Sequence, residues 1–449
     1  MTTIQVTNTR SGNPGVSGWN AILPDSAPPR VLDKRIIADF LVIGGGFTGL
    51  AAARRLSQNA PEAKIVLVDA IRIGAGAAGR SSGFMIDLPH DISAESYTSS
   101  IERDKRQTEM NRTALTFASE AAEEYGFSRD IFDPRGKINV AADATGDKHN
   151  VEYAEYLHKM GEPCTPLDAA DMRRISGTDY YVSGLHTPGA IMIQPAGYVR
   201  GLADGLTQTG AVDIYENTAV LALNRAGDVW HAKTERGMVT TPKIVLAVNG
   251  HIQSFGFYKR RLMHVFLYGS LTRPLTPSEK KQLGGEPTWE FVPADPMGST
   301  MRRINSAQGS RILTRNKFVY SSSLEASEKS VQQAARDHDR AFAARFPMIK
   351  NVTMEYRWGG RLCLSWHSDP VFGEIEHGIY AACCQNGLGA SLGTLSGMLA
   401  ADYATGIDNP YIATYLDAPK PPLLPPEPFS LIGATAYLNW KEWRAGREK

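Results

Sequence analysis

The chain has 449 residues, with 48 Lys and Arg against 47 Asp and Glu, and a formal net charge of +1. So small a charge gives no electrostatic footprint for nucleic acid or for an anionic membrane surface, and we expect a small-molecule partner. No segment approaches the ~18 to 20 apolar residues of a membrane span, and the first residues lack the order of a signal peptide. We therefore expect a cytoplasmic protein. The four cysteines lack the paired spacing of a metal site, so we expect no metal.

The beginning of the chain predicts an arm followed by a nucleotide-binding unit. Residues 1–37 are polar and rich in Gly and Pro, which is typical of an extended arm, with Trp19 as its expected anchor. The apolar run Phe40 to Ile43 is followed by GGGFTG and then by Ala, Leu and Arg at helical spacing. This order predicts strand, tight turn and helix, the start of a dinucleotide-binding fold.

The next apolar run, KIVLVD, ends in Asp69, twenty residues after Gly49. An acid at this place binds ribose hydroxyls and repels a 2′-phosphate, so the site favours FAD or NAD over NADP. A second glycine cluster, GAGAAGRSSGF, begins at Gly74. A simple nicotinamide enzyme would show another strand and helix at this point, so the cluster favours FAD.

The remaining segments alternate between two predicted lobes. Polar helices and a short strand fill 95–185, and apolar alternation over 260–345 predicts an antiparallel sheet. A last glycine cluster, CCQNGLGASLGTLSGMLAA, reads as the end of a strand, a turn and a helix of small residues. The tail begins with PKPPLLPPEP and ends in the basic amphipathic YLNWKEWRAGREK. For this ending we favour packing on the body over a membrane-surface anchor.

These motifs in this order resemble the D-amino-acid oxidase-like FAD-dependent oxidoreductases of the glycine and sarcosine oxidase type, and most of all the gamma-glutamylputrescine oxidases. The resemblance rests on Trp19, DFLVIGGGFTGL, GAGAAGRSSG, RWGG at 357–360 and the last glycine cluster. It implies an α/β fold: a Rossmann-type FAD-binding domain with an interleaved mixed-sheet (α+β) substrate domain that forms a cap.

The resemblance also implies how the chain is divided. The arm covers 1–37 and the tail 421–449. The FAD-binding domain takes 38–94, 186–260 and 346–420, and the cap takes 95–185 and 261–345.

By position, the resemblance assigns pyrophosphate contacts to the first glycine motif, ribose to Asp69, an adenine contact to Val220 and the flavin ring to the last cluster. The expected cofactor-binding residues are Gly44, Gly46, Phe47, Thr48, Gly49, Asp69, Ala70, Gly79, Arg80, Ser81, Ser82, Gly83, Val220, Ala247, Asn249, Gly360, Gly387, Leu388 and Gly389.

The expected reaction is oxidation of the C–N bond of an amine or amino acid, with hydride passing to flavin N5. The cofactor carries this chemistry, so few acid and base residues are needed. We expect Gly387, Leu388 and Gly389 to aim backbone N–H groups and a helix dipole at flavin N1 and O2, where negative charge develops.

Substrate residues are expected on the cap sheet, where the candidates are Tyr268, Arg315 and Trp366, followed by Arg302 and His367. Arg315 stands where relatives often carry glycine. It is either a fork for a substrate carboxylate or a surface arginine on a hairpin. His90 and Asp91 follow the flavin loop and either approach the substrate or cap a helix.

Cys363 falls close to the cysteine that joins covalently to flavin in sarcosine oxidases, but a buried thiol is usually a small hydrophobe. We therefore expect FAD to be bound non-covalently.

Three functions stay open at this point. The first is an oxidase that forms an imine, then an aldehyde or keto acid, with O₂ as acceptor and H₂O₂ as product. The second is a dehydrogenase that passes electrons to a quinone or another carrier. The third is a flavin-holding subunit of a larger complex. A secondary amine, an N-alkyl amino acid or a gamma-glutamyl amine would suit the family as substrate.

Overall fold

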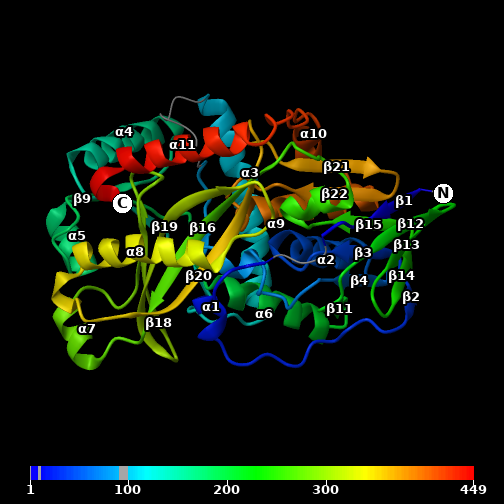
Figure 1. Cartoon of the computed structure of the whole chain (residues 1–449), viewed down its shortest axis with the longest axis horizontal. Helices are drawn as coiled ribbons and strands as arrows, with labels where there is room; N and C mark the ends of the chain where they lie inside the picture. Colours follow the sequence, from blue (N-terminus) through cyan, green and yellow to red (C-terminus); the bar gives the residue numbers. More distant parts are fainter. Residues whose placement is uncertain (1, 9–11, 90–99) are drawn as a thin grey trace.

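A computed structural model describes residues 2–8, 12–89 and 100–449 (Figure 1). Its centre is a six-stranded sheet in the order β11-β4-β3-β15-β22-β21. The strands are β3 (Phe40–Ile43), β4 (Ile65–Val68), β11 (Asp213–Tyr215), β15 (Lys243–Leu246), β21 (Val371–Glu376) and β22 (Ile379–Cys383). All neighbours pair in parallel except β21, which is antiparallel to β22. This arrangement is the predicted Rossmann-type sheet.

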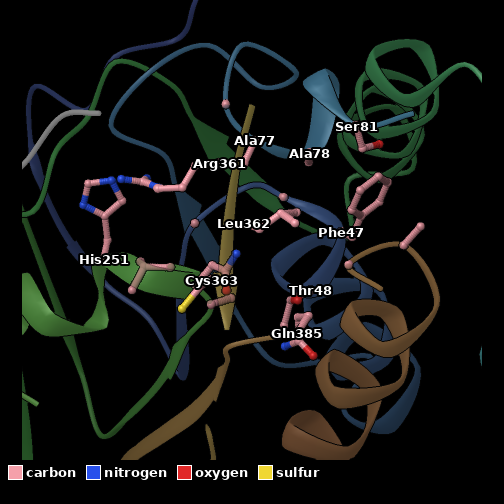
Figure 2. A pocket seen from close by; sticks show the side chains of 18 of the residues that line it. Phe47, Thr48, Ala77, Ala78, Ser81, His251, Arg361, Leu362, Cys363 and Gln385 are labelled. Atoms are coloured by element: carbon pink, nitrogen blue, oxygen red, sulfur yellow. The ribbon is translucent and has the colours of Figure 1, made fainter. Parts of the chain in front are cut away.

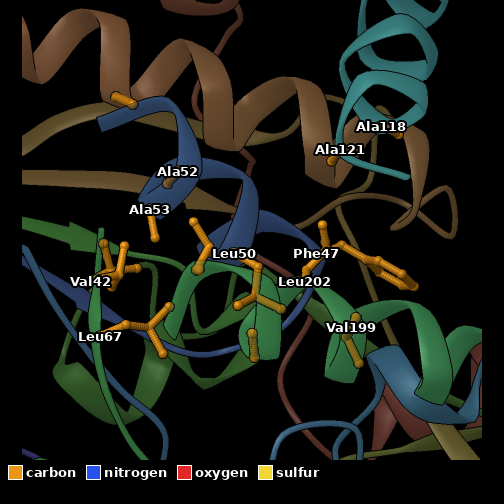
Figure 3. Packing of buried hydrophobic residues seen from close by; sticks show 14 of the residues in the cluster. Val42, Phe47, Leu50, Ala52, Ala53, Leu67, Ala118, Ala121, Val199 and Leu202 are labelled. Carbon is orange, nitrogen blue, oxygen red and sulfur yellow. The ribbon is translucent and has the colours of Figure 1, made fainter. Parts of the chain in front are cut away.

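The parallel strands are covered on both faces, which explains their nearly continuous apolar sequence. On one face Val42 and Leu67 pack against helices α2 (Phe47–Asn59), α3 (Ile101–Glu124), α6 (Pro195–Gln208) and α9 (Ser391–Thr405) (Figure 3). On the other face Leu41 and Val66 pack against a second sheet. Its strands are β1 (Thr3–Gln5), β12 (Ala222–Ala226), β13 (Val229–Lys233), β14 (Met238–Thr241) and β2 (Arg35–Ile37).

The cap is an eight-stranded mixed sheet in the order β20-β16-β19-β18-β17-β7-β9-β8. Its strands are β7 (Lys137–Ala141), β8 (Thr165–Leu167), β9 (Ser183–Thr187), β16 (Met263–Thr272), β17 (Trp289–Pro293), β18 (Thr300–Ser306), β19 (Gly309–Ser321) and β20 (Met354–Leu364). The sheet is mixed because β17 pairs in parallel with β7, whereas its other pairs are antiparallel.

Helices flank the cap sheet and link it to the rest of the chain. They are α4 (Ala144–Met160), α5 (Ala169–Ser176), α7 (Pro277–Leu283), α8 (Glu328–Arg345) and α11 (Phe429–Arg444). A small sheet of β5 (Phe84–Met85), β10 (Ile191–Ile193) and β6 (Phe132–Asp133) lies where the chain passes between the two lobes. Shorter elements are α1 (Gly18–Ala21), α10 (Pro410–Leu416) and four 3₁₀ turns at Ala78–Arg80, Asn249–Phe255, Pro347–Ile349 and Gly446–Glu448.

Three segments lie differently from the simplest division of the chain. β20 falls in the segment expected for FAD binding but pairs with β16 of the cap sheet. α3 falls in a segment expected for the cap, but Leu115 and Ala118 pack in the core beside α2. The arm supplies two strands, β1 and β2, and buries Trp19. The domain boundaries themselves stay a prediction. Within the described ranges, no helix has the length and apolar character needed to cross a membrane.

Candidate functional site

A cavity of about 310 Å³ runs from the first βα turn to the inner face of the cap sheet (Figure 2). At one end it is lined by Gly46 and Asp69, and at the other by Thr300, Arg315 and Phe318. Figure 2 shows Phe47, Thr48 and Gln385 on one wall and His251 with Arg361 on another. The cavity therefore joins the predicted nucleotide end to the predicted substrate end.

The three glycines of the first turn have separate structural duties. Gly44 has φ +108°, and a Cβ there would lie 2.6 Å from the Ala247 carbonyl oxygen. A Cβ on Gly49 would lie 1.7 Å from the Gly44 carbonyl oxygen, so only glycine lets α2 pack at this point. Gly46 is different, because its nearest neighbour would be the Ala78 side chain at 3.6 Å, beside the open cavity. Gly46 is the N-cap residue of α2 and has no side chain that could accept from the first N–H groups of the helix. These backbone N–H groups are therefore available to a phosphate.

Asp69 follows β4 at the edge of the same cavity. Its carboxylate accepts hydrogen bonds from the backbone N–H of Gly45 at 2.7 Å and of Ile71 at 2.9 Å. Burial raises the pKa of Asp69 to about 6, although both backbone hydrogen bonds favour the charged form. Since each carboxylate oxygen has a second acceptor position, Asp69 can still receive a ribose hydroxyl.

The affinity for FAD is expected to depend on pH through Asp69. The charged carboxylate is the better acceptor for a ribose hydroxyl, so affinity should be constant above pH 6, fall below it and approach about tenfold loss per pH unit. Titrating apoprotein with FAD from pH 5 to pH 8, by flavin fluorescence, measures this. In the matched control Asp69→Asn the slope should disappear. The same slope in both proteins would contradict the assignment.

The second glycine loop is held from outside by three donors. Trp358 Nε1 donates to the Arg80 carbonyl at 3.1 Å, Trp19 Nε1 to that of Ser81 at 2.8 Å, and Arg302 Nη1 to that of Ser82 at 2.7 Å. Within the described part of the chain, the N–H groups of Ser81, Ser82 and Gly83 have no recorded hydrogen bond. All three residues line the cavity, so the loop offers backbone donors to a bound ring system.

Arg80 acts mainly as a clamp. Its guanidinium donates to the carbonyl oxygens of Ala75, Pro14, Gly359 and Gly15 at 2.9–3.2 Å. It thereby ties the loop to the arm and to β20, with its stem lining a second, small cavity. The expectation of a cofactor contact at Arg80 stays a prediction, but its polar atoms already have partners.

The last glycine cluster forms a tight turn before α9. Asn386 has φ +48° and Gly387 φ +87°, and residues Gly387, Leu388 and Gly389 all line the cavity. Ala390 caps α9 without a side-chain hydrogen bond. The buried Oε1 of Gln385, beside this turn, also lacks a partner. The turn therefore presents polar groups and a helix N-terminus to the cavity, while its contact with the flavin ring stays a prediction.

Most of the other expected cofactor residues also meet at the cavity. Its wall includes Phe47, Thr48, Ala70, Val220, Ala247 and Asn249. Gly49 and Gly79 do not line the cavity but lie behind its wall. At each of them the absence of a Cβ lets a backbone carbonyl oxygen approach closely. Gly360 lines the small cavity instead. The open cradle at Gly46 and the unpartnered donors of the second loop fit an extended FAD.

The structure places some of the substrate candidates at the cavities and others away from them. Arg315 lines both cavities, and Tyr268 lines the small one with its hydroxyl buried. Trp366 is wrongly placed by the sequence: β20 ends at Leu364, so Trp366 lies in the following loop, 67 % exposed and outside both cavities. In the same loop His367 pairs with Asp369. His90 and Asp91 lie outside the described residues.

Arg315 is half-buried and has no acidic partner among the residues that the structure describes. Its recorded hydrogen bond is long, 3.4 Å from Nη1 to the Thr300 hydroxyl, and its guanidinium lies over the Phe318 ring at 5.3 Å. Burial lowers the pKa of Arg315 to about 10, so the group remains a cation at neutral pH. It is therefore not a surface arginine, the other possibility that the sequence left open. A half-buried cation that lines a cavity can accept an anion as its partner.

His251 and Arg361 were missed by sequence reasoning. Both line the cavity and lie beside each other in Figure 2. Burial, together with the Arg361 cation, lowers the pKa of His251 to about 3, so the imidazole is neutral. His251 directly follows Asn249 and Gly250 at the end of a predicted strand, and this position was the available signal. The approach of β20 that brings Arg361 is a long-range pairing with no local signal.

Cys363 is 1 % exposed and lies in the cavity wall among the apolar residues behind the six-stranded sheet. Burial, with the neighbouring Cys363 thiol as a further cause, raises the pKa of Cys384 well above its usual range. Both thiols therefore belong to an apolar layer rather than to an activated pair.

We expect acid precipitation to release all FAD from the protein, because the Cys363 thiol lies buried among apolar residues, where a thiol is usually a small hydrophobe. The absorbance of the supernatant measures this. A yellow pellet would contradict the expectation, and loss of that colour in Cys363→Ser would assign the link to Cys363.

Glu442 of α11 also shapes the site from a distance. Lys317 in β19 has φ +64°, and the ladder between β16 and β19 shifts register there. Glu442 accepts from the Phe318 N–H at 3.0 Å and from Lys317 Nζ at 2.7 Å. The carboxylate therefore stabilises the bulge that lies between Arg315 and Phe318 in the cavity wall.

Glu442→Ala is expected to lower the free energy of unfolding by about 1–3 kcal/mol, because it leaves the bulge N–H buried without an acceptor. Urea denaturation measures this loss. Glu152→Ala, which removes an exposed ion pair with Lys148, is the control and should change stability by less than about 0.5 kcal/mol. Equal effects in both variants would contradict the role of Glu442.

The fold and the cavity together define a dinucleotide-binding flavoprotein. The family model described as FAD dependent oxidoreductase (DAO) matches residues 39–403. The chain belongs to this family, is an FAD-dependent oxidoreductase and uses FAD, which confirms the expected fold class, family and cofactor.

Individual proteins resemble the chain over most of its length. It is 26 % identical over 378 residues to the probable oxidoreductase OrdL of Haemophilus influenzae, covering 83 % of this chain and 84 % of the relative. It is 24 % identical to the gamma-glutamylputrescine oxidoreductase of Escherichia coli, covering 92 % and 94 %. Glycine oxidase from Geobacillus kaustophilus superposes with a TM-score of 0.68 at 18 % identity, covering 85 % and 98 %.

Proposed function

We propose that this chain oxidises the C–N bond of a small amine that carries a carboxylate. The observation that carries the proposal is Arg315, a half-buried guanidinium that lines the end of the FAD cavity and forms no ion pair with the described residues. Amino acids, N-alkyl amino acids and gamma-glutamyl amines all have such a carboxylate. The names of the similar proteins, glycine oxidase and gamma-glutamylputrescine oxidoreductase, support this class of substrate.

In the proposed reaction the substrate loses a hydride from the carbon that bears nitrogen and a proton from the nitrogen, which gives an imine. Water then hydrolyses the imine to an aldehyde or keto acid and releases an amine or ammonia. FAD, when bound, supplies the hydride acceptor. Arg315 would hold the carboxylate through two parallel hydrogen bonds and so fix the position of the reacting carbon.

Two further groups would complete the site. The N–H groups of Gly387 and Gly389 would stabilise negative charge that develops on the ring side of the cavity, whereas the Leu388 N–H donates to the Gln385 carbonyl oxygen at 3.0 Å. His251 is neutral because of its burial beside Arg361, so it can share a hydrogen bond with the substrate nitrogen without repelling a cationic amine. We propose O₂ as the electron acceptor, with H₂O₂ as product. The alternatives are a dehydrogenase that uses a quinone or carrier, and a flavin subunit that needs a partner.

A matched pair of substrates tests the proposed class. N-methylglycine and N-methylethylamine differ in the carboxylate, and kcat/KM should favour the carboxylate by about 10²-fold or more. The same comparison can be made between glycine and methylamine. It can also be made between a gamma-glutamyl amine and the N-acyl analogue of that amine that lacks the carboxylate. Equal kcat/KM within every pair would overturn the proposal.

A further inference from the structure

Three neighbouring strands of the cap sheet place an apolar wall beside Arg315. Thr300 of β18 pairs with Arg315 of β19, and Met301 of β18 pairs with Phe291 of β17. Val292, the residue after Phe291, therefore lies opposite Thr300 and continues the row that Arg315 begins. Residues opposite each other in adjacent strands point to the same face of a sheet, and all three of this row line the cavity. A cation and an apolar side chain are thus held two strands apart, about 10 Å, on one face.

Phe318 and two prolines extend this apolar wall. The Phe318 side chain is buried, and the centre of its ring lies 5.3 Å from the Arg315 guanidinium. Pro293 ends β17, Pro296 follows it closely in the chain, and both line the cavity together with Phe318. Proline has a fixed ring and no N–H, so this segment offers a ligand a rigid apolar surface. A substrate whose carboxylate meets Arg315 would therefore place its adjoining carbon atoms against apolar groups.

The described residues supply no carboxylate to this end of the cavity. Among those that line it, the one acid is Asp69, at the nucleotide end. Asp295 stands between the two prolines in the chain, but it accepts from the Met297 N–H at 2.8 Å and does not line the cavity. A substrate with an additional ammonium group would meet the Arg315 cation and apolar side chains here, with no described acid as its partner.

We propose that the substrate carries an apolar group beside its carboxylate, and that Val292, Pro293, Pro296 and Phe318 form the surface that selects it. The class is an aliphatic α-amino acid or its N-alkyl derivative, as opposed to a gamma-glutamyl diamine, whose α-ammonium group is an additional charge. This inference rests on the proposed function, in which Arg315 binds the carboxylate. Burial of the apolar group against the wall supplies the selectivity.

Binding of carboxylates that cannot be oxidised tests this inference separately from catalysis. The ligands 3,3-dimethylbutanoate and N,N,N-trimethylglycine have the same shape, and they differ in a carbon atom against a positively charged nitrogen. Neither has an N–H bond or a nitrogen lone pair, so neither can form an imine. We expect 3,3-dimethylbutanoate to bind the FAD-loaded protein about tenfold more tightly than trimethylglycine, and about tenfold more tightly than acetate. Titration calorimetry measures the three dissociation constants.

Two variants locate the apolar surface. Phe318→Ala should weaken the binding of 3,3-dimethylbutanoate about tenfold and that of acetate less than about twofold. Val292→Thr keeps the shape of the side chain but replaces a methyl with a hydroxyl group, so it should weaken the binding of 3,3-dimethylbutanoate about threefold. Val151→Thr, at a residue 53 % exposed on α4, is the matched control and should bind like the wild type. The flavin absorbance of each variant shows that it has folded and bound its cofactor.

The outcomes distinguish this inference from the proposed function. Equal affinities for acetate, trimethylglycine and 3,3-dimethylbutanoate would overturn the apolar selection and leave the carboxylate receptor intact. Equal weakening of acetate and 3,3-dimethylbutanoate in Phe318→Ala, with no change in Val292→Thr, would also overturn it. If the wild type binds none of the three carboxylates, the proposed role of Arg315 fails and this inference falls with it.

Discussion

Arg315→Met is expected to lower kcat/KM for a carboxylate-bearing substrate by about 10²- to 10³-fold, while kcat/KM for the matched amine without a carboxylate changes little. The reason is that the guanidinium is half-buried, lines the cavity and has no anionic partner in the described chain. A methionine fills similar space without charge. Steady-state kinetics with N-methylglycine and N-methylethylamine measure both values.

Two controls accompany this variant. Arg315→Lys keeps the charge but not the planar fork, so it should recover only part of the activity. Thermal unfolding of Arg315→Met should occur at or above the wild-type temperature, because the variant removes a partly desolvated charge that has no counter-ion among the described residues. An equal loss of kcat/KM for both substrates would show that Arg315 does not bind the carboxylate.

Gly46→Ala and Gly49→Ala should separate cofactor binding from folding. A Cβ on Gly46 would project beside the open cradle, so this variant should fold normally but bind FAD about 10- to 100-fold more weakly. A Cβ on Gly49 would lie 1.7 Å from a backbone oxygen that cannot yield, so that variant should lose about 3 kcal/mol or more of stability.

Fluorescence titration with FAD and urea denaturation of the apoproteins measure these two quantities. Normal FAD affinity in Gly46→Ala would place the pyrophosphate elsewhere. Normal stability in Gly49→Ala would mean that α2 can move away from the Gly44 carbonyl.

The nucleotide end of the site was predictable because its signals are local. Gly44, Gly46 and Asp69 belong to one βαβ unit, and their spacing alone predicts the turn, the cradle and the acid, all of which line the cavity. The fold class and FAD followed from the order of three glycine clusters. The contacts of individual residues with FAD stay predictions.

The substrate end was predicted less well because long-range pairing forms it. β20 joins β16 of the cap, which places Arg361 and Cys363 in the cavity wall although they stand in a segment expected for the other domain. Trp366 was expected on the cap sheet but lies in the loop after β20, because the end of this strand could not be located from the sequence. Its contact with substrate stays a prediction. Arg80 belongs to a recognisable glycine-rich motif, but only the structure shows that its guanidinium donates hydrogen bonds to backbone carbonyl oxygens.

The structure of the C-terminal tail was also only partly predictable from its sequence. Its amphipathic pattern indicated a helix or strip packed on the body, and the structure has the helix α11 there. The pattern does not reveal which face meets the body. Glu442, a charged residue, is buried, whereas Trp443 beside it is exposed. The clamp of Glu442 on the β19 bulge explains this inversion, because the bulge N–H requires an acceptor.

The visible spectrum of the purified protein during anaerobic addition of substrate tests the central claim most directly. We expect flavin absorbance near ~450 nm. This absorbance should bleach with a carboxylate-bearing amine and return when air is admitted, and it should persist with the matched amine without a carboxylate. Bleaching that persists in air would make the protein a dehydrogenase. A colourless protein that takes up no added FAD would contradict the account.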